Sequence, residues 1–323
     1  MENTKKRPRI LVVGSLVMDL ICSTPRFPQR GETVIGTDFR TAPGGKGANQ
    51  AVQAARLGAS VTMVGKVGRD DFGEQIKRSL ADSGVNVDKI MYSETRPTAI
   101  GNIQLEVTEQ GTENRILVIP GANMDIRVED VAYLADEISN YDMVILQLEI
   151  PMEINTAVAK IAHAAGVPVM LNSAPSAPLP EELLACLAYI SPNEHEAKDI
   201  TGIAVTDAAS AEQAIGCMRD KGVQNVLITL GSHGAAFSDG NGLVLSPCVD
   251  YDTVADPTAA GDSFVGAFCT AICLGASPEE AMLFANHTAG ITVSRMGAQP
   301  SLPVLAEVVA FMKKNGHDVA RYE

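Results

Sequence analysis

The sequence predicts an α/β fold in which a mainly parallel central sheet lies between two layers of helices, a three-layer α/β/α sandwich, with a small antiparallel lid sheet. Short apolar runs alternate along the chain with amphipathic helical stretches, which is typical of parallel sheets. Two stretches, 31–43 and 98–119, have strand composition but no accompanying helix. We therefore expect residues 1–323 to form a single domain, with the lid sheet taken from about 15–43 and 97–122.

The elements follow in order from the first buried run, ILVVG at 10–14. Glycines end several of the amphipathic stretches, as at Gly58 and Gly84, which is a common helix stop. The stretch 98–119 has a turn-rich centre, TEQGTEN, between alternating residues, which indicates a hairpin. A lid over the site is the favoured interpretation of this hairpin, and a simple edge extension of the main sheet is the alternative. Further strands are expected at 60–65, 143–149, 168–172 and 225–231, and helices at 48–57, 70–84, 153–166, 181–188, 193–202, 211–222, 259–274, 278–295 and 303–315.

Composition and charge narrow the classes of function. Of 323 residues, 46% are hydrophobic and 20% charged, so a sizeable core is expected. The formal net charge of −14 repels polyanions, and we expect no nucleic-acid partner. No run is apolar enough to span a bilayer, and Asp19 interrupts the one that resembles a signal peptide. The six cysteines contain no CxxC pair, which favours reduced, buried thiols and a cytoplasmic location.

The stretch TAAGDSF, residues 258–264, carries the strongest chemical signal. Small residues at 259–261 allow a ligand close to the backbone, and a helix starting there would direct unpaired N–H groups at an anion. Asp262 in that first turn is placed to accept a proton from an attacking hydroxyl while the N–H groups stabilise a transferring phosphoryl group. An acid that merely caps the helix is the alternative.

A second signal is the glycine-rich stretch PGGKGANQAVQAA at 43–55, which leads into a helix. It is neither a Walker A loop nor a GxGxxG fingerprint, which argues against a nicotinamide oxidoreductase. Lys46 and Asn49 suit a polyhydroxylated ligand, because an amide both donates and accepts. A tight turn without function is the alternative.

Polar residues at the ends of predicted strands form the remaining signals. Asp19 follows the first strand, in an apolar run where it needs a hydrogen-bond partner. Asn193 and Glu196 are three apart on one predicted helix, where they can serve Mg²⁺ or phosphate or form an ordinary solvated helix start. ITLGSHGA at 228–235 is a strand ending in a glycine-bounded turn, compatible with a nucleotide, whereas SRMGAQPS at 294–301 is uninformative alone.

Taken together and in this order, these residues resemble the ribokinase-like carbohydrate kinase family over about residues 9–312. The combination of GGKGANQA near the start with AAGDSF near the end is the most specific part of the resemblance. It implies a ribokinase-like fold, ATP-dependent phosphorylation of a pentose at its primary 5-hydroxyl, and cofactors Mg²⁺ and K⁺. It also implies a homodimer formed through the lid sheet.

The resemblance also implies a role for each candidate residue. Asp262 would be the base, and the backbone of Ala259, Ala260 and Gly261 the anion hole. The sugar would be held at Val17, Asp19, Gly45, Lys46, Gly47, Asn49 and Glu149; phosphates and Mg²⁺ by Asn193 and Glu196; the nucleotide by Thr229, Gly231, Ser232, Gly234, Gly261 and Asn286; and K⁺, mostly through carbonyls, by Asp256, Thr258, Thr292, Arg295, Gly297 and Ser301.

One position departs from the family pattern. Members that act on ribose usually carry a polar residue at the position of Val17, where it contacts sugar hydroxyls, and valine offers no hydrogen bond. The sequence therefore leaves 2-deoxyribose open as an alternative substrate, along with other sugars and nucleosides. A non-catalytic sugar-binding regulator is the alternative from a different class, and the presence of Asp262, Gly261 and Lys46 argues against it.

Overall fold

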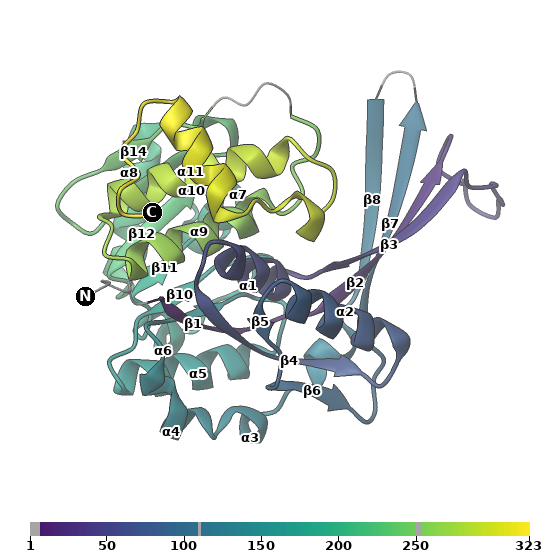
Figure 1. Cartoon of the computed structure of the whole chain (residues 1–323), viewed down its shortest axis with the longest axis horizontal. Coiled ribbons are helices and arrows are strands. Elements are labelled where there is room, and N and C mark those ends of the chain that lie inside the picture. The colour runs from purple at the N-terminus through teal and green to yellow at the C-terminus, as the bar shows by residue number, and fades with distance from the viewer. Residues whose placement is uncertain (1–6, 109–110, 250–253) are drawn as a thin grey trace.

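The structure, a computed structural model, describes residues 7–108, 111–249 and 254–323. Its central sheet is built around six parallel strands, with two antiparallel strands at one edge and two short parallel strands at the other (Figure 1). The strand order is β14-β13-β12-β11-β10-β9-β1-β4-β5, and β6 also pairs with β4. The strands are β1 Arg9–Val13, β4 Ser60–Gly68, β5 Val85–Asn86, β6 Ile90–Ser93, β9 Met143–Leu146, β10 Val169–Leu171, β11 Tyr189–Ile190, β12 Asn225–Thr229, β13 Ala235–Ser238 and β14 Val244–Ser246.

The two helical layers follow from the way β1 alternates between the faces of the sheet. Ile10 and Val12 join one buried apolar cluster, whereas Leu11 and Val13 join the other. The first cluster contains residues from α1 Lys46–Arg56, α2 Asp71–Asp82, α9 Ala260–Cys273, α10 Pro278–Val293 and α11 Leu305–Lys314. The second contains residues from α3 Val128–Val131, α4 Leu134–Glu137, α5 Met152–Ala164, α6 Glu181–Leu184, α7 Glu194–Thr201 and α8 Ala208–Asp220.

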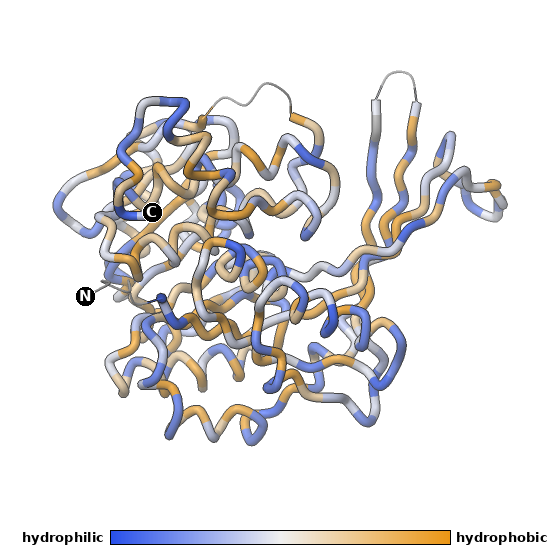
Figure 2. The backbone as a smooth tube through the Cα atoms, in the orientation of Figure 1, coloured by the Kyte–Doolittle hydropathy of each residue, from blue (hydrophilic) through white to orange (hydrophobic). Residues whose placement is uncertain are grey.

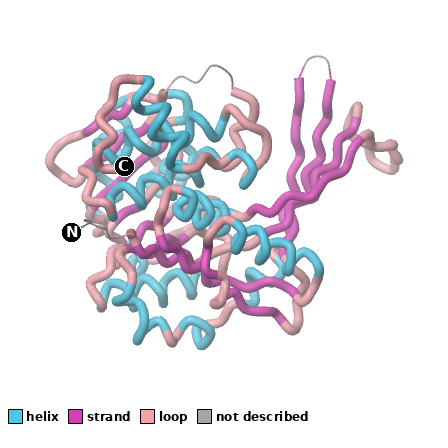
Figure 3. Tube along the Cα trace, viewed as in Figure 1, coloured by secondary structure: helices cyan, strands magenta, loops and turns pink. Residues whose placement is uncertain are grey.

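A second sheet of four strands, which we call the lid sheet, projects from this body (Figures 1 and 3). It consists of β2 Val17–Thr24, β3 Asp38–Gly44, β7 Ala99–Thr108 and β8 Gly111–Ile119, in the order β3-β2-β7-β8. The β2–β3 and β7–β8 pairs are antiparallel, and a parallel β2–β7 pairing joins them into one sheet. Figure 2 shows hydrophobic segments on this projecting sheet.

The predicted fold class is confirmed, with local differences. The helix expected at 181–188 ends after Leu184, and the chain then enters the two-residue strand β11. The strand composition at 31–43 becomes a strand only from Asp38 onward. The antiparallel edge strands β13 and β14 were not predicted.

Two expectations about membranes and cysteines can also be compared with the structure. No helix in the described part of the chain has the length and apolar character needed to cross a membrane. The six cysteines form no disulfide among the described residues. The expected burial holds for Cys269, whereas Cys248 is exposed in the loop after β14, and the remaining four are half-buried: Cys22, Cys186, Cys217 and Cys273.

Candidate active site

A cavity of about 640 Å³ opens beside the carboxyl ends of β10, β11 and β12. This is where open parallel sheets place their ligand sites, because the loops that leave neighbouring strands converge there. Of the residues singled out in the sequence, the cavity is lined by Lys46, Asn193, Glu196, Thr229, Gly231, Ser232, Gly234, Ala259, Ala260, Gly261, Asp262 and Asn286.

The N-terminus of α9 forms one wall of this cavity. Ala259, which precedes the helix, has φ 61, and among the described residues it is the one non-glycine residue in the left-handed region. The N–H groups of Gly261 and Asp262 have no hydrogen-bond acceptor among the described residues. A Cβ built on Gly261 would meet no atom within 4 Å, so the space beside these N–H groups is open. The helix end therefore presents two donors and a positive dipole end to the cavity.

Asp262 lies directly behind these donors and is only 7% exposed. One carboxylate oxygen, Oδ2, accepts a hydrogen bond from Asn49 Nδ2 at 2.8 Å, and Oδ1 accepts one from Gln50 Nε2 at 3.0 Å. Burial raises the pKa of Asp262, while Lys46 and the two amides act in the opposite direction and Glu149 raises the pKa further. A buried carboxylate with a raised pKa beside a cavity is suited to proton transfer.

The N-terminus of α1 lies beside Asp262. Glu149 Oε2 accepts the N–H of Lys46 at 3.0 Å and also the hydroxyl of Ser15, whose Oγ in turn accepts the N–H of Gly47 at 3.1 Å. Gly45 adopts φ 92, and a Cβ there would lie 3.0 Å from the backbone nitrogen of Val17. The glycines thus allow the start of α1 to pack against the end of β1 and the start of β2.

Among the described residues that line the cavity, Lys46 alone carries a positively charged side chain. Burial acts to lower the pKa of Lys46, but the neighbouring carboxylates of Asp262, Glu149 and Glu196 raise it above its ordinary value. The ammonium group therefore stays charged and can bind an anion, even though the whole chain carries a net charge of −14.

Val17 and Asp19 reach this region from β2 of the lid sheet. Asp19 lies opposite Gly101 of β7, and a Cβ built on Gly101 would come within 2.4 Å of its carboxylate. Burial, followed by the charge of Glu149, raises the pKa of Asp19 to about 7. Val17 is 6% exposed and pairs with Gly44 and Ala99. Val17, Asp19, Gly45, Gly47, Asn49 and Glu149 adjoin the start of α1 but do not line the 640 Å³ cavity itself.

Asn193 and Glu196 form the start of α7 at another side of the cavity. Asn193 Oδ1 accepts the N–H of Glu196 at 2.9 Å, and Glu196 Oε2 accepts the N–H of Asn193 at 2.9 Å, a reciprocal capping box. Glu196 is only 8% exposed, and burial raises its pKa despite the opposing hydrogen bond from Asn193. The simple solvated helix start considered above is therefore wrong, because this carboxylate is buried beside the cavity.

The loop between β12 and β13 closes the cavity near Thr229. Its 3-10 turn, Gly231–His233, begins at Gly231, which has φ 52, and is followed by Gly234, which has φ 92. Asn286 of α10 also lines the cavity, and its Nδ2 donates to Ser246 Oγ at 2.9 Å and to Pro247 O at 3.0 Å. These contacts hold the loop that carries Cys248 and Val249, which also line the cavity.

The residues singled out for a monovalent cation do not line the cavity: Asp256 and Thr258 lie in the loop before α9, Thr292 lies in the last turn of α10, and Arg295, Gly297 and Ser301 lie in the segment that follows α10. Asp256 joins the loops: Oδ1 accepts the N–H of Thr258 and Oδ2 that of Gly297, both at 2.9 Å. Arg295 forms an ion pair with Glu307, so its guanidinium is already compensated. The hydroxyls of Thr292 and Ser301 donate to the carbonyls of Thr288 and Ala298.

Several residues near the site were not predicted from the sequence. Asn172 and Ser191 line the cavity at the ends of β10 and β11, and a polar residue closing an apolar run was the signal that could have identified them. Gln50 and Gln147 lie behind Asp262 and are fully buried. Gln147 also follows an apolar run directly, whereas Gln50 has no local signal.

Comparisons with known proteins identify the family of this chain. The model of the family described as "pfkB family carbohydrate kinase" matches residues 7–305. The ribokinase of Bacillus subtilis is 40% identical over 301 residues, covering 93% of this chain and 97% of that protein. That of Schizosaccharomyces pombe is 39% identical over 312 residues, covering 93% of this chain and 96% of its own. A solved structure of Arabidopsis thaliana ribokinase complexed with ribose and ATP has a TM-score of 0.89 and 35% identity, covering 95% of this chain and 99% of that one. The resemblance inferred from the motifs is confirmed, and the chain belongs to the pfkB family of carbohydrate kinases.

Proposed function

We propose that this chain transfers the γ-phosphoryl group of ATP to the primary 5-hydroxyl of a pentose, D-ribose in the leading interpretation. The observation that carries the proposal is the position of Asp262, buried beside a 640 Å³ cavity, next to two unpaired N–H groups of α9 and near Lys46. The relatives described as ribokinases, and the solved ribokinase with ribose and ATP, support the choice of substrates.

The chemistry is a direct in-line displacement. Asp262 accepts the proton of the sugar hydroxyl as its oxygen bonds to the γ-phosphorus, and the bond from phosphorus to the β-phosphate oxygen breaks. The N–H groups of Gly261 and Asp262 stabilise the negative charge on the transferring group. Lys46 adds a positive charge at the same end of the cavity and supports the anion through Coulomb attraction.

Asn49 and Asp19 suit a polyhydroxylated substrate. Asn49 Nδ2 is used by Asp262, but its Oδ1 has no partner among the described residues, which leaves an acceptor for a sugar hydroxyl. Asp19 supplies a second acceptor, a buried carboxyl group whose charge no cation among the described residues compensates. Binding of hydroxyl groups would satisfy both.

Glu196 and Asn193 fit a role in holding Mg²⁺ through its bound water molecules. The carboxylate of Glu196 is buried against the cavity, and oxygen donors are the ligands that Mg²⁺ prefers. When bound, Mg²⁺ neutralises charge on the phosphates, which lowers the barrier to transfer. Thr229, Gly231, Ser232, Gly234 and Asn286 would line the nucleotide end of the cavity.

The loops that carry Asp256 and Gly297 fit a K⁺ ion in the chemistry of their donors. They offer a carboxylate, hydroxyls and backbone carbonyls, and carbonyl oxygens are the usual ligands of K⁺. Thr258 and Ala259 connect this region directly to the start of α9. A cation bound there would fix the N–H groups of α9 without contacting the substrate.

Val17 favours a second candidate, a 2-deoxyribose kinase. Its side chain is buried next to Gly45, at a position where a polar residue would contact a sugar hydroxyl. An apolar side chain forms no hydrogen bond with a sugar hydroxyl, so the binding free energy depends little on whether that hydroxyl is present. The two candidates share every catalytic group and differ only in this discrimination.

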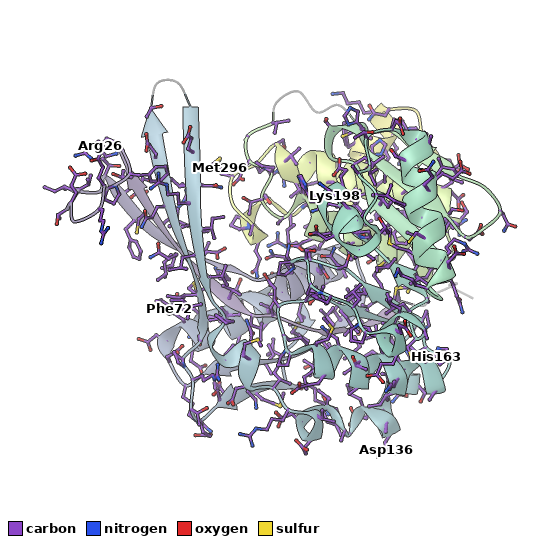
Figure 4. All side chains as sticks on the ribbon, turned by 180° about the vertical axis from the view of Figure 1, so that it is seen from behind. Arg26, Phe72, Asp136, His163, Lys198 and Met296 are labelled. Carbon is purple, nitrogen blue, oxygen red and sulfur yellow. The ribbon has the colours of Figure 1, made fainter. Side chains whose placement is uncertain are left out.

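The lid sheet supports a homodimer. Apolar side chains on both faces of it are more than 40% exposed, and a second copy would cover those of one face. Figure 4 shows Arg26 at the outer part of the lid sheet and Met296 on the side of the body turned toward it. The exposed apolar residues are Phe39, Val107, Ile116, Leu117, Val118 and Ile119. A cytoplasmic location is also part of the proposal, because the cytoplasm supplies ATP and keeps cysteine thiols reduced.

A coupled assay of ADP release tests the function. Pentose-dependent ADP formation with ribose or 2-deoxyribose is the expected result, and comparison of kcat/KM for the two sugars selects between the candidates. A ribose preference of about a hundredfold or more would exclude the second candidate. ATP and sugar binding without turnover would instead identify a non-catalytic regulator.

A further inference from the structure

A chain of buried amide side chains runs behind the cavity and ends on Asp262. Gln50 and Gln147 are fully buried, and Asn172 is 8% exposed. Gln147 Nε2 donates to Gln50 Oε1 at 2.7 Å, and Gln50 Nε2 donates both to Asp262 Oδ1 and to Asn172 Oδ1 at 3.0 Å. The chain joins α1, α9 and the ends of β9 and β10, which are far apart in the sequence.

The orientation of each amide is fixed from the backbone outward. Asn172 Nδ2 donates to the carbonyl of Ser191 at 2.8 Å, and a carbonyl can only accept. Asn172 therefore turns its acceptor, Oδ1, toward Gln50, and the NH₂ group of Gln50 donates to it. The same NH₂ group faces Asp262, so the network places a donor against the carboxylate whether or not that carboxylate is protonated.

At the other end of this hydrogen-bonded network, the orientation of the amides leaves one acceptor of Gln147 unpaired. Because Gln50 turns Oε1 toward Gln147, Gln147 presents Nε2 to it, and its own Oε1 is buried without a partner among the described residues. That oxygen lies so close to Gly14 that a Cβ there would be 1.9 Å from it. Leaving a buried acceptor unpaired costs stability, so a network kept only for stability would not be arranged in this way.

We propose that Gln50 is a positioning residue for phosphoryl transfer, and that Gln147 and Asn172 lock its amide so that it holds the Asp262 carboxylate in a fixed orientation. The inference rests on the proposed function. Gln50 is fully buried and both ends of its amide are occupied by Asp262, Asn172 and Gln147, so it acts through Asp262 rather than on the substrate. Asn49 holds the second oxygen, and together the two amides leave the carboxylate little freedom to rotate.

The charged groups that face Asp262 come from three other places in the fold. Lys46 at the start of α1 favours the ionised carboxylate, whereas Glu149 after β9 and Glu196 on α7 oppose it. A donor from Gln50 favours the ionised form, so its loss moves the pKa of the base upward. Activity that needs the ionised base then falls at a higher pH on the acid side of the profile.

The test replaces Gln50 by methionine, which keeps the length of the side chain and removes its donor. Gln50→Met is expected to lower kcat about 10- to 100-fold, the size expected for one charge-assisted hydrogen bond. KM for the sugar and for ATP should change by less than about threefold, and the acid limb of the pH profile should move upward. Gln53→Met is the matched control, because Gln53 is equally buried on α1 but donates to Pro303 O.

A second variant separates positioning from folding. Gln147→Met should lower kcat several-fold in the unmodified chain and should have no further effect when combined with Gln50→Met. The proposal is overturned if Gln50→Met retains kcat within about twofold of Gln53→Met, if its acid limb does not move, or if Gln147→Met acts equally in both backgrounds. An unmodified chain without pentose-dependent turnover would instead refute the proposed function.

Discussion

Replacing Asp262 by asparagine tests the proposed base with the least change of shape. The carboxylate now accepts from Asn49 Nδ2 at 2.8 Å and from Gln50 Nε2 at 3.0 Å. The amide in Asp262→Asn has one accepting end and one donating end. One of the two neighbouring amides therefore faces a donor instead of an acceptor, and the proton acceptor for the sugar hydroxyl is lost.

The expected cost is confined to catalysis. Loss of a general base lowers kcat by about 10²–10⁴, which corresponds to about 3–5 kcal/mol in the activation free energy. KM for ATP should change little, because the nucleotide end of the cavity is unchanged. Burial raises the pKa of Asp262, so the ionised carboxylate costs folding free energy at neutral pH. Asp262→Asn removes this cost but loses one hydrogen bond, and we expect Tm to stay within about 4 °C of the parent.

The assay measures steady-state kcat and KM by coupled ADP release, together with Tm by calorimetry. Asp199→Asn is the control, because it removes one negative charge from an exposed position on α7. We expect the control to retain kcat within about twofold. Turnover by Asp262→Asn close to that of the control would refute the assignment of the base.

The remaining predictions concern pH, specificity and cations. The pKa of Asp19 is raised from 3.8 to about 7, so its contribution to the free energy of unfolding is fully present below pH 4 and is lost as pH rises through about 7. Asp19→Asn should therefore raise Tm more at pH 8 than at pH 4 in calorimetry. Equal shifts at the two pH values would contradict this reasoning. Val17→Asn should increase kcat/KM for ribose relative to 2-deoxyribose by about tenfold or more, and an unchanged ratio would show that Val17 does not contact the discriminating hydroxyl. Exchange of K⁺ for Na⁺ should lower kcat about fivefold or more in the parent chain but not in Asp256→Ala, whose loops lack the linking carboxylate; equal sensitivity in both would place the cation elsewhere.

The long elements of the body could be predicted from the sequence because their apolar residues repeat with a clear period. The expected helix at 278–295 corresponds to α10, Pro278–Val293, whose capping box at Ser277 and N-terminal proline mark its start. Strand β11 was missed because two residues are too few to show alternation, and the apolar run before it continued the helical pattern. The pairing of β2 with β7 depends on contacts across about eighty residues, which no local pattern contains.

The candidate site could be predicted where function requires unusual residue combinations. TAAGDSF and GGKGANQ stand out because glycines, an acid and a base occur together at element ends. Their assigned roles remain predictions, as do the Mg²⁺ and K⁺ sites and the dimer. The role of Gln50 could not be predicted, because glutamine is common and the contacts of Gln50 with Asn172 and Asp262 join segments more than a hundred residues apart.

Val17 and Asp19 belong to β2, a strand of the lid sheet, whereas Asp262 belongs to α9 of the body. Two residues proposed to bind the sugar thus belong to the lid sheet, whereas the proposed base belongs to the body. Tilting of β2 would change the distance between the bound alcohol and its proton acceptor. Sugar affinity then depends on the orientation of the lid sheet. If a second copy binds to the lid sheet and changes the affinity for the sugar by some factor, the sugar must change the affinity between the two copies by the same factor.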